Sequence, residues 1–292
     1  MEAALKNSFA HCSRIAWQSS SNFYWSFWLL PRAKRRAMCA LYAFARHTDD
    51  LSDNDGPVET RRGRLDEWRE SLVQALDGRA DNELLPAVAD TAREFNIPHE
   101  YLFDLLDGVE MDLDFQPFET YDELREYCYR VASAVGLACL HVWGFTGDEA
   151  IEPAIQCGQA FQLTNILRDL KEDASIGRVY LPLEDLRRFN YSPAELESGV
   201  ADQRLSKLLA FEFERAEQLY HAAAALDAHL HRDGQRAFNL MTTTYWRLLQ
   251  QMKRQETDQV FKGRTRLRFH QKLSVAVPAM FGKTFRSVLQ KK

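Results

Sequence analysis

The chain has 292 residues, of which 46% are apolar and 27% charged, and its formal net charge is −5. This composition is ordinary for a globular protein, and the negative balance gives no general signature of nucleic-acid binding. With only 13 glycines and 9 prolines, the chain has fewer turn residues than a β-sandwich or barrel would need.

Apolar residues recur at three- and four-residue steps along most of the chain, which predicts helices. In chain order, the predicted helices span residues 32–53, 61–76, 84–95, 101–113, 121–145, 150–173, 203–231 and 236–255. No strict apolar–polar alternation or hairpin signal appears, and no break is long enough for a domain linker. We therefore expect an all-helical protein of about ten helices, with residues 1–292 forming a single domain.

The cysteines and the N-terminus bear on location. Five cysteines are present, an odd number with no C-x-x-C spacing, which favours a reducing cytosol over disulfides or a zinc site. The N-terminus lacks the pattern of a signal peptide, and no apolar run reaches about 18 residues. We expect a cytoplasmic protein without a membrane span.

The C-terminal segment 259–292 differs from the rest of the chain. It contains nine Lys and Arg and no acidic residue, with apolar side chains interleaved. Such a basic amphipathic stretch can lie on an anionic membrane surface, here the inner face of the membrane. The alternative is a C-terminal helix docked on the body with its charged face in water.

Two Asp pairs with the same internal spacing are the most informative feature of the sequence. Asp49 and Asp53 follow an apolar turn, and Asp169 and Asp173 follow another about 120 residues later. On a helix this spacing places both carboxylates on one face, where they repel each other. Such a cost indicates a cationic ligand, and hard oxygen ligands suit Mg²⁺ bound together with substrate phosphates.

Cationic and amide side chains accompany both pairs. Arg46 precedes Asp49 by three residues, Arg168 immediately precedes Asp169, and Arg178 follows shortly after. Asn165 lies one turn before Asp169, where its amide oxygen can join the metal or the phosphates. Together these residues could hold several Mg²⁺ ions and a leaving diphosphate.

An aromatic cluster follows a polar one near the N-terminus. Residues 19–21 are serines, and five of the six residues 23–28 are aromatic. Hydroxyl and backbone N–H groups at a helix start suit phosphate oxygens, whereas aromatic faces suit a polyene or a carbocation. Tyr42, Tyr127 and Tyr129 extend this set, which predicts an apolar tunnel with a metal–diphosphate site at its mouth.

Simpler interpretations exist for each motif. A single D-x-x-x-D on a helix is usually a solvated face, and Phe23, Phe27 and Tyr42 at helical spacing are more often core than pocket. The eight histidines form no zinc pattern. No nucleophile elbow, Rossmann fingerprint or P-loop is present.

Three segments together resemble the squalene/phytoene synthase family of head-to-head prenyl transferases. Residues 42–53 resemble the first Asp-rich motif of the family, and residues 127–136 resemble its central signature. Residues 162–173, followed by Gly-Arg-Val-Tyr-Leu-Pro at 177–182, resemble the second Asp-rich motif. The resemblance runs from about Cys12 to Leu273 and implies an all-α isoprenoid-synthase bundle around a central cavity.

The resemblance also implies roles for individual residues. The metal ligands would be Asp49, Asp53, Asn165, Asp169 and Asp173, holding Mg²⁺, for which Mn²⁺ can substitute. The diphosphates would be bound by Ser20, Ser21, Arg46, Arg168, Arg178 and Tyr180. The pocket for the prenyl chains would be lined by Phe23, Phe27, Tyr42 and Gln162. The catalytic residues would be Asp49, Asp53, Asp169, Asp173, Tyr127, Arg46 and Arg168.

The resemblance implies condensation of two prenyl diphosphates. Two farnesyl diphosphates would give presqualene diphosphate or squalene, with NADPH needed only for fully reduced squalene. The alternative is a C20 phytoene or a dehydrosqualene synthase. The product would serve hopanoid, sterol or carotenoid biosynthesis, with downstream isoprenoid enzymes as partners. A remote alternative is a non-catalytic assembly relative, although such relatives tend to lose Asp residues that are all present here.

Overall fold

The computed structural model describes residues 2–19, 22–53, 56–80, 82–261, 263–265 and 284–290. The side chains of Glu2, Asn22, Phe23, Asp53 and Val260 lie outside this description. Ser20, Ser21 and most of segment 259–292, which carry predictions made above, also lie outside it.

The described part of the chain is helical, with one isolated bridge between Phe145 and Leu230 as its only extended pairing. The N-terminal half contains α1 (Glu2–Gln18), α2 (Asn22–Phe27), α3 (Arg32–Asp53), α4 (Val58–Leu76), α5 (Leu85–Glu94) and α6 (Glu100–Leu113). The centre contains α7 (Tyr121–Cys128), η1 (Tyr129–Ser133), α8 (Ala134–Trp143), η2 (Asp148–Ala150) and α9 (Ile151–Ser175). The remainder contains α10 (Leu183–Arg188), α11 (Pro193–Glu197), α12 (Gln203–Ala223), η3 (Ala224–Ala228), α13 (Arg232–Lys253), η4 (Thr257–Phe261) and α15 (Phe285–Leu289).

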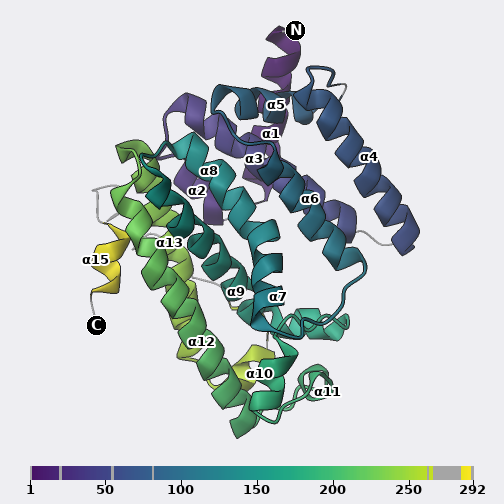
Figure 1. Cartoon of the computed structure of the whole chain (residues 1–292), viewed down its shortest axis with the longest axis vertical. Helices are drawn as coiled ribbons and strands as arrows, with labels where there is room; N and C mark the ends of the chain where they lie inside the picture. The colour runs from purple at the N-terminus through teal and green to yellow at the C-terminus, as the bar shows by residue number, and fades with distance from the viewer. Residues whose placement is uncertain are drawn as a thin grey trace.

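The helices divide between the two ends of an elongated body (Figure 1). The helices α1, α3, α4, α5 and α6 lie toward one end, and α10, α11 and most of α12 lie toward the other. One hydrophobic cluster fills the first end and a second fills the other, and Phe161 of α9 packs against both. The helices α8 and α9 therefore run through the middle, where the two clusters meet.

Several predicted helices differ from the observed ones. The stretch 121–145 is not one α-helix, because a π-helical turn, η1, separates α7 from α8. The stretch 203–231 also breaks, since α12 ends at Ala223 and a 3-10 turn follows. The sequence-based spans missed the helices α1, α2, α10, α11 and α15. Apart from α1, these helices have only five or six residues, too few to show a clear period.

The π-helical turn is fixed by close backbone packing. A Cβ on Gly158 of α9 would lie 2.5 Å from Ser133 Cα and 2.7 Å from Ser133 N. A Cβ on Gly108 of α6 would lie 2.7 Å from a methyl carbon of Val131. Glycine at both positions lets α6 and α9 approach the turn from two sides. The interruption of the helix therefore depends on the absence of two side chains.

The described helices include none that is both long enough and apolar enough to cross a bilayer. The sequence-based expectation of one domain over 1–292 stays a prediction.

Candidate active site

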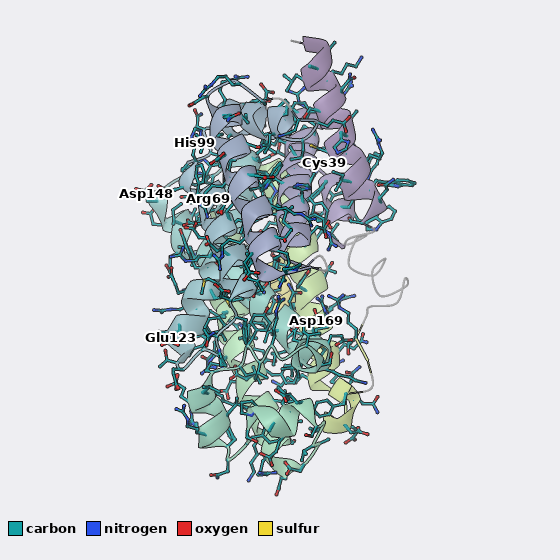
Figure 2. All side chains as sticks on the ribbon, turned by 90° about the vertical axis from the view of Figure 1, so that its right-hand side faces the viewer. Cys39, Arg69, His99, Glu123, Asp148 and Asp169 are labelled. Carbon is teal, nitrogen blue, oxygen red and sulfur yellow. The ribbon has the colours of Figure 1, made fainter. Side chains whose placement is uncertain are left out.

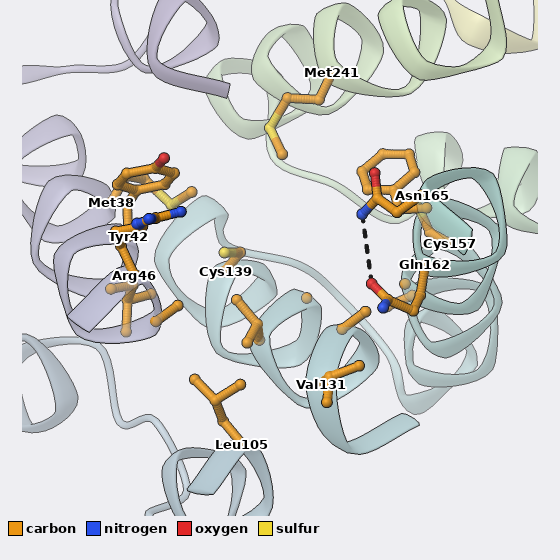
Figure 3. Close-up of a pocket in the computed structure, with 18 of the residues that line it drawn as sticks. Met38, Tyr42, Arg46, Leu105, Val131, Cys139, Cys157, Gln162, Asn165 and Met241 are labelled. Carbon is orange, nitrogen blue, oxygen red and sulfur yellow. Dashed lines mark hydrogen bonds between the residues drawn. The ribbon is translucent and has the colours of Figure 1, made fainter. Parts of the chain in front are cut away.

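A cavity of about 290 Å³ lies between α3 and α9, with η1 and α8 forming one of its walls. The helix α8 packs against both α3 and α9 and so holds them apart. Figure 3 shows Tyr42 and Arg46 on one side of this space and Gln162 and Asn165 on the other. Apolar side chains, among them Leu105, Val131, Cys139 and Met241, line much of the remainder.

One face of α3 carries a row of side chains, here called the stripe on α3, that changes from apolar to acidic along the helix. Met38, Tyr42, Arg46 and Asp49 follow one another at helical spacing, and all four line the cavity. The stripe continues to Asp53, whose side chain lies outside the description. Because Asp53 is also the last residue of α3, the acidic end coincides with the negative end of the helix dipole.

The stripe on α9 repeats this arrangement. Gln162 and Asn165 line the cavity, and Asp169 and Asp173 continue the same face toward the end of the helix at Ser175. Figure 2 shows Asp169 about midway along the long axis of the molecule. Neither α3 nor α9 has a basic residue in its last turn to offset the dipole. Both helices therefore place carboxylates where negative charge is least favourable, which makes external cations stabilising.

Two arginines hold Asp169. Arg168 Nε donates to Oδ1 at 2.8 Å and Arg168 Nη2 donates to Oδ2 at 2.6 Å. Arg264, from the segment after α13, lies on the same carboxylate, with Nε 2.7 Å from Oδ1 and Nη2 2.8 Å from Oδ2. A metal ion or a diphosphate at Asp169 would exchange with at least one of these guanidinium groups.

The second carboxylate of this pair is electrostatically unfavourable. Burial raises the pKa of Asp173 to about 7, and the neighbouring Asp169 and Asp112 carboxylates add to the rise while Arg178 opposes it. On the other helix, Arg46 Nη2 lies 2.5 Å from Asp50 Oδ1. Burial opposes the charge on Arg46, but Asp50 and Asp49 raise the pKa of its guanidinium on balance.

A third acidic residue, Asp112 at the end of α6, organises the wall beside Asp173. Tyr127 donates its hydroxyl to Oδ2 at 2.9 Å, and Tyr180 donates to Oδ1 at 2.8 Å. Arg178 Nη2 donates to the Asp112 backbone carbonyl at 3.1 Å. Burial and the Asp112 carboxylate raise the pKa of both tyrosine hydroxyls, so these hydroxyls stay protonated donors.

The structure therefore divides the predicted residues into groups. Phe27, Tyr42, Arg46, Asp49, Gln162 and Asn165 line the cavity. Arg168, Asp169, Asp173, Arg178, Tyr127 and Tyr180 lie outside its lining, grouped around the end of α9 and Asp112. Tyr127 was expected to extend the lining, but it is buried in the second hydrophobic cluster, where its hydroxyl faces Asp112. The roles of all these residues stay predictions.

Sequence reasoning missed three residues of this region. Asp112 stands in no recognisable spacing, and Tyr245 of α13 shows no motif, although its ring stacks on Phe161 at 4.5 Å. Burial opposes the charge on Arg168, but Asp169 and, to a smaller extent, Tyr245 raise the pKa of its guanidinium. Arg264 was noted only as one of the basic residues of segment 259–292. These three residues reach the end of α9 from α6, α13 and the segment after α13, so only the tertiary structure reveals them.

The donor set fits Mg²⁺. All candidate ligands are oxygens. Asn165 Oδ1 is buried and has no hydrogen-bond partner among the described residues, and an ion or a phosphate-bound water could supply one. Among the side chains that the structure describes, no three His, Cys, Asp or Glu gather closely enough to hold an ion by themselves. Mg²⁺ commonly uses one or two carboxylates together with substrate phosphates, and the pairs here suit that arrangement.

Comparison with known proteins decides the family. The model for squalene/phytoene synthases matches residues 17–271, which is most of the chain. The chain belongs to the squalene/phytoene synthase family. Members of the squalene/phytoene synthase family are prenyltransferase-type enzymes that condense prenyl diphosphates head to head. The predicted family, enzyme class and all-α isoprenoid-synthase fold are thus confirmed.

Individual relatives cover most of the chain. A phytoene synthase from Arthrospira platensis is 38% identical over 275 residues, covering 90% of this chain and 89% of the relative. A presqualene diphosphate synthase from Rhodopseudomonas palustris is 38% identical over 235 residues, covering 79% and 82%. A crystal structure of a dehydrosqualene synthase with ligand superposes with a TM-score of 0.87 at 29% identity, covering 99% of this chain and 98% of that chain.

Proposed function

We propose that this enzyme condenses two prenyl diphosphates by a 1'-1 linkage, in the cavity between α3 and α9. The observation that carries the proposal is the paired arrangement of this site. Each of the two helices runs from an apolar cavity wall to an acidic end that has arginine beside it. A hydrocarbon chain fits the apolar part, and a diphosphate fits the arginine-bearing acidic part.

The proposed reaction begins when the C1–O bond of one allylic diphosphate breaks, with the bonding electrons leaving on the diphosphate. Arg46, Arg168 and Arg178 take up the negative charge that develops there. The C2=C3 double bond of the second molecule attacks the resulting cation, and loss of a proton closes a cyclopropane ring. Mg²⁺ held by Asp49, Asp53, Asn165, Asp169 and Asp173 supplies Lewis-acid stabilisation of the leaving diphosphate when bound.

The cavity walls protect the cation. Phe27 and Tyr42 line the cavity with ring centroids 6.3 Å apart, and aromatic faces stabilise positive charge. The apolar lining excludes water that would otherwise quench the cation. Ser20, Ser21 and Phe23, which lie outside the description or have side chains outside it, keep their proposed roles at the diphosphate and the prenyl chain.

Two substrate lengths are supported. We propose two C15 farnesyl diphosphates giving presqualene diphosphate or squalene first, in line with the Rhodopseudomonas relative and the dehydrosqualene synthase fold. The C20 alternative, giving phytoene, is supported by the Arthrospira relative, which matches a larger share of this chain at the same identity. The product would feed hopanoid, sterol or carotenoid biosynthesis in the cytoplasm.

One experiment separates these products. Purified protein with Mg²⁺ is incubated with labelled farnesyl or geranylgeranyl diphosphate, with and without NADPH, and the products are identified by mass spectrometry. Turnover of the C20 substrate alone would overturn the C15 proposal. Formation of squalene only with NADPH would assign the hydride donor.

The metal role has its own test. Asp49→Asn and Asp169→Asn should each lower the rate of diphosphate release by at least about 100-fold. Each substitution removes a carboxylate charge that would hold Mg²⁺, and this ion would stabilise the leaving diphosphate. Glu172→Gln is the matched control, since this exposed carboxylate adjoins Asp173 outside the acidic stripe. Full activity in an Asp49→Asn/Asp169→Asn double variant would contradict the assignment.

A further inference from the structure

Three exposed tryptophans in one short stretch of the sequence lie outside the proposed chemistry. Among the described residues, five large hydrophobic side chains are more than 45% exposed, and three of them are tryptophans within twelve residues. Trp17 is 65% exposed at the end of α1, Trp25 61% in α2, and Trp28 55% in the turn that follows. Tryptophan is costly to leave in water, and its amphipathic ring favours the boundary between water and lipid.

The stretch of sequence that carries these tryptophans is one-sided in charge, although three of its cations pair with carboxylates, in the pairs Lys34–Asp233, Arg36–Glu94 and Arg46–Asp50. Residues 3–48 contain seven Lys and Arg and no Asp or Glu, whereas the rest of the chain has a formal charge of −12. Lys6, Arg14 and Arg32 are exposed, and the Arg35 guanidinium lies 4.6 Å from the centre of the Trp28 ring. An acidic protein with a locally basic, tryptophan-bearing face is complementary to an anionic lipid surface.

An aromatic series joins this face to the cavity. Phe27 and Tyr42 line the cavity, and the Tyr24 ring lies 6.2 Å from Phe27. Tyr24 in turn contacts the exposed rings of Trp25 at 6.4 Å and Trp28 at 6.2 Å. The cavity wall and the exposed rings of Trp25 and Trp28 thus belong to one packed set on α2, the turn after it and α3.

We propose that the surface formed by Trp17, Trp25 and Trp28 with Arg14, Arg32 and Arg35 docks on an anionic bilayer and sets the cavity beside it. The use of this surface rests on the proposed function, because both substrate and product would then carry long hydrocarbon chains. Docking lets those chains pass between cavity and bilayer along aromatic walls rather than through water. This surface is formed by residues other than those of segment 259–292, for which membrane contact was predicted from charge.

Vesicle flotation tests the docking without any substrate. The full-length protein should bind vesicles of phosphatidylcholine with phosphatidylglycerol, bind phosphatidylcholine alone less, and dissociate as salt rises. A Trp17→Ser/Trp25→Ser/Trp28→Ser variant should lower the partition coefficient at least about tenfold. The matched control is Val73→Ser/Ile176→Ser, which removes the other two exposed side chains of this kind and should bind as the wild type does.

Charge variants test the second part of the surface. Arg14→Gln/Arg32→Gln should lower binding to the anionic vesicles roughly 25-fold, because each cation near such a surface contributes about fivefold. Arg79→Gln/Arg125→Gln is the matched control, since both residues are exposed elsewhere. Equal losses for the two pairs would show a general effect of net charge and would overturn the proposal.

Tryptophan fluorescence gives a readout that needs no variant. Trp68 and Trp143 are buried and Trp246 is half-buried, so lipid contact should act mainly on the three exposed rings. Brominated lipids should quench the emission of vesicle-bound wild-type protein and shift it to the blue. Bound protein without quenching would overturn the proposal.

Three further outcomes would also overturn it. The first is that the protein does not bind vesicles. The second is that only an Arg266→Gln/Arg268→Gln/Lys272→Gln variant loses binding. The third is that the protein self-associates without lipid and that the triple tryptophan variant abolishes this association. The second would assign the membrane contact to segment 259–292, and the third would assign the tryptophans to an interface between copies. Product formation is measured separately, so that turnover without vesicle binding rejects the docking while the proposed function stands.

Discussion

At the scale of single residues, the carboxylates near the end of α9 differ in what surrounds them. Asp169 lies between Arg168 and Arg264, whereas Asp112 receives two neutral hydroxyls and Asp173 is buried beside like charges. A carboxylate buried beside other carboxylates tends to take up a proton, as the raised pKa of Asp173 reflects, whereas Asp169 has two guanidinium groups as its partners. The three aspartates near the end of α9 therefore differ in their electrostatic surroundings.

The hydroxyls on Asp112 give a test at this scale. Tyr127→Phe and Tyr180→Phe should each lower the free energy of unfolding by about 1–3 kcal/mol, because each leaves one oxygen of the Asp112 carboxyl group without its donor. Chemical denaturation measures the effect. Tyr24→Phe is the control, because the Tyr24 ring packs against other aromatic rings and phenylalanine preserves those contacts.

A double variant completes this test. If Asp112 links the two tyrosines, the losses in Tyr127→Phe/Tyr180→Phe should differ from the sum of the single losses. The rings stack with centroids 5.3 Å apart, so they also contact each other directly, and phenylalanine preserves that contact. Wild-type stability in both single variants would contradict the assigned hydrogen bonds.

At the scale of helices, the site depends on α8 and η1 keeping α3 and α9 apart. The π-helical turn is a local irregularity, of the kind that proteins often place at functional sites. Here it sits where Val131 and Ala132 face the cavity and where Gly158 lets α9 pack against Ser133. The width of the cavity is thus coupled to the absence of a side chain on α9.

Gly158→Ala should therefore be destabilising despite the higher helix propensity of alanine. The new Cβ would meet backbone atoms at 2.5 Å and 2.7 Å, and such overpacking typically costs about 1–3 kcal/mol. Gly136→Ala is the matched control, because its Cβ would have no neighbour closer than 3.7 Å and should stabilise the helix by up to ~1 kcal/mol. Thermal unfolding of both variants measures the difference, and equal melting temperatures would contradict the packing argument.

A buried charge group connects α10 with α12. Arg215 Nη1 lies 2.8 Å from Asp185 Oδ2 and 2.8 Å from the Glu212 carboxylate. Glu212 is fully buried, and burial raises its pKa above the ordinary value although Arg215 opposes the shift. The folded protein therefore holds a proton at Glu212 more tightly than the unfolded chain does.

This shift predicts a pH dependence of stability. From the ordinary glutamate pKa of about 4.3 upward to the raised value, the folded state binds more protons than the unfolded state, so the free energy of unfolding falls as pH rises. Below that window both states are protonated and the penalty is absent. Glu212→Gln should make stability less sensitive to pH across this window, whereas Glu214→Gln, an exposed neighbour, should not. Urea unfolding at a series of pH values decides, and identical slopes in all three proteins would reject the assignment.

At the scale of the whole molecule, the two hydrophobic clusters meet around the helices that carry the cavity. Residues from α6, α13 and the segment after α13 converge with α9 at its acidic end. Binding of a metal ion and binding of a diphosphate at this end should depend on each other, because Asp169 already pairs with two guanidinium groups. A metal alone must compete with the arginines, and a diphosphate alone must approach carboxylates.

Mg²⁺ and inorganic pyrophosphate should therefore bind cooperatively. Together they should raise the melting temperature by more than the sum of their separate effects, and a ligand at 100 times its dissociation constant adds about 2.7 kcal/mol of stability. Differential scanning calorimetry measures the shifts, and EDTA should reverse them. Additive shifts would argue against a shared site, and the Asp49→Asn/Asp169→Asn variant should lose the cooperative part.

The sequence by itself determined the helical class, the family and the placing of each Asp pair on one helix face. The helical class and the position of each Asp pair depend on periodicity and on spacing within a few turns, which neighbouring residues specify locally. The family followed from the resemblance of three segments to known motifs. The tertiary structure decided that α3 and α9 face each other across a cavity, that Tyr127 turns to Asp112, and that Arg264 reaches Asp169. It also left Trp25 and Trp28 exposed in a segment where sequence suggested a lined pocket. Such contacts join residues far apart in the chain, so they follow from how the helices pack and not from the local pattern of any one of them.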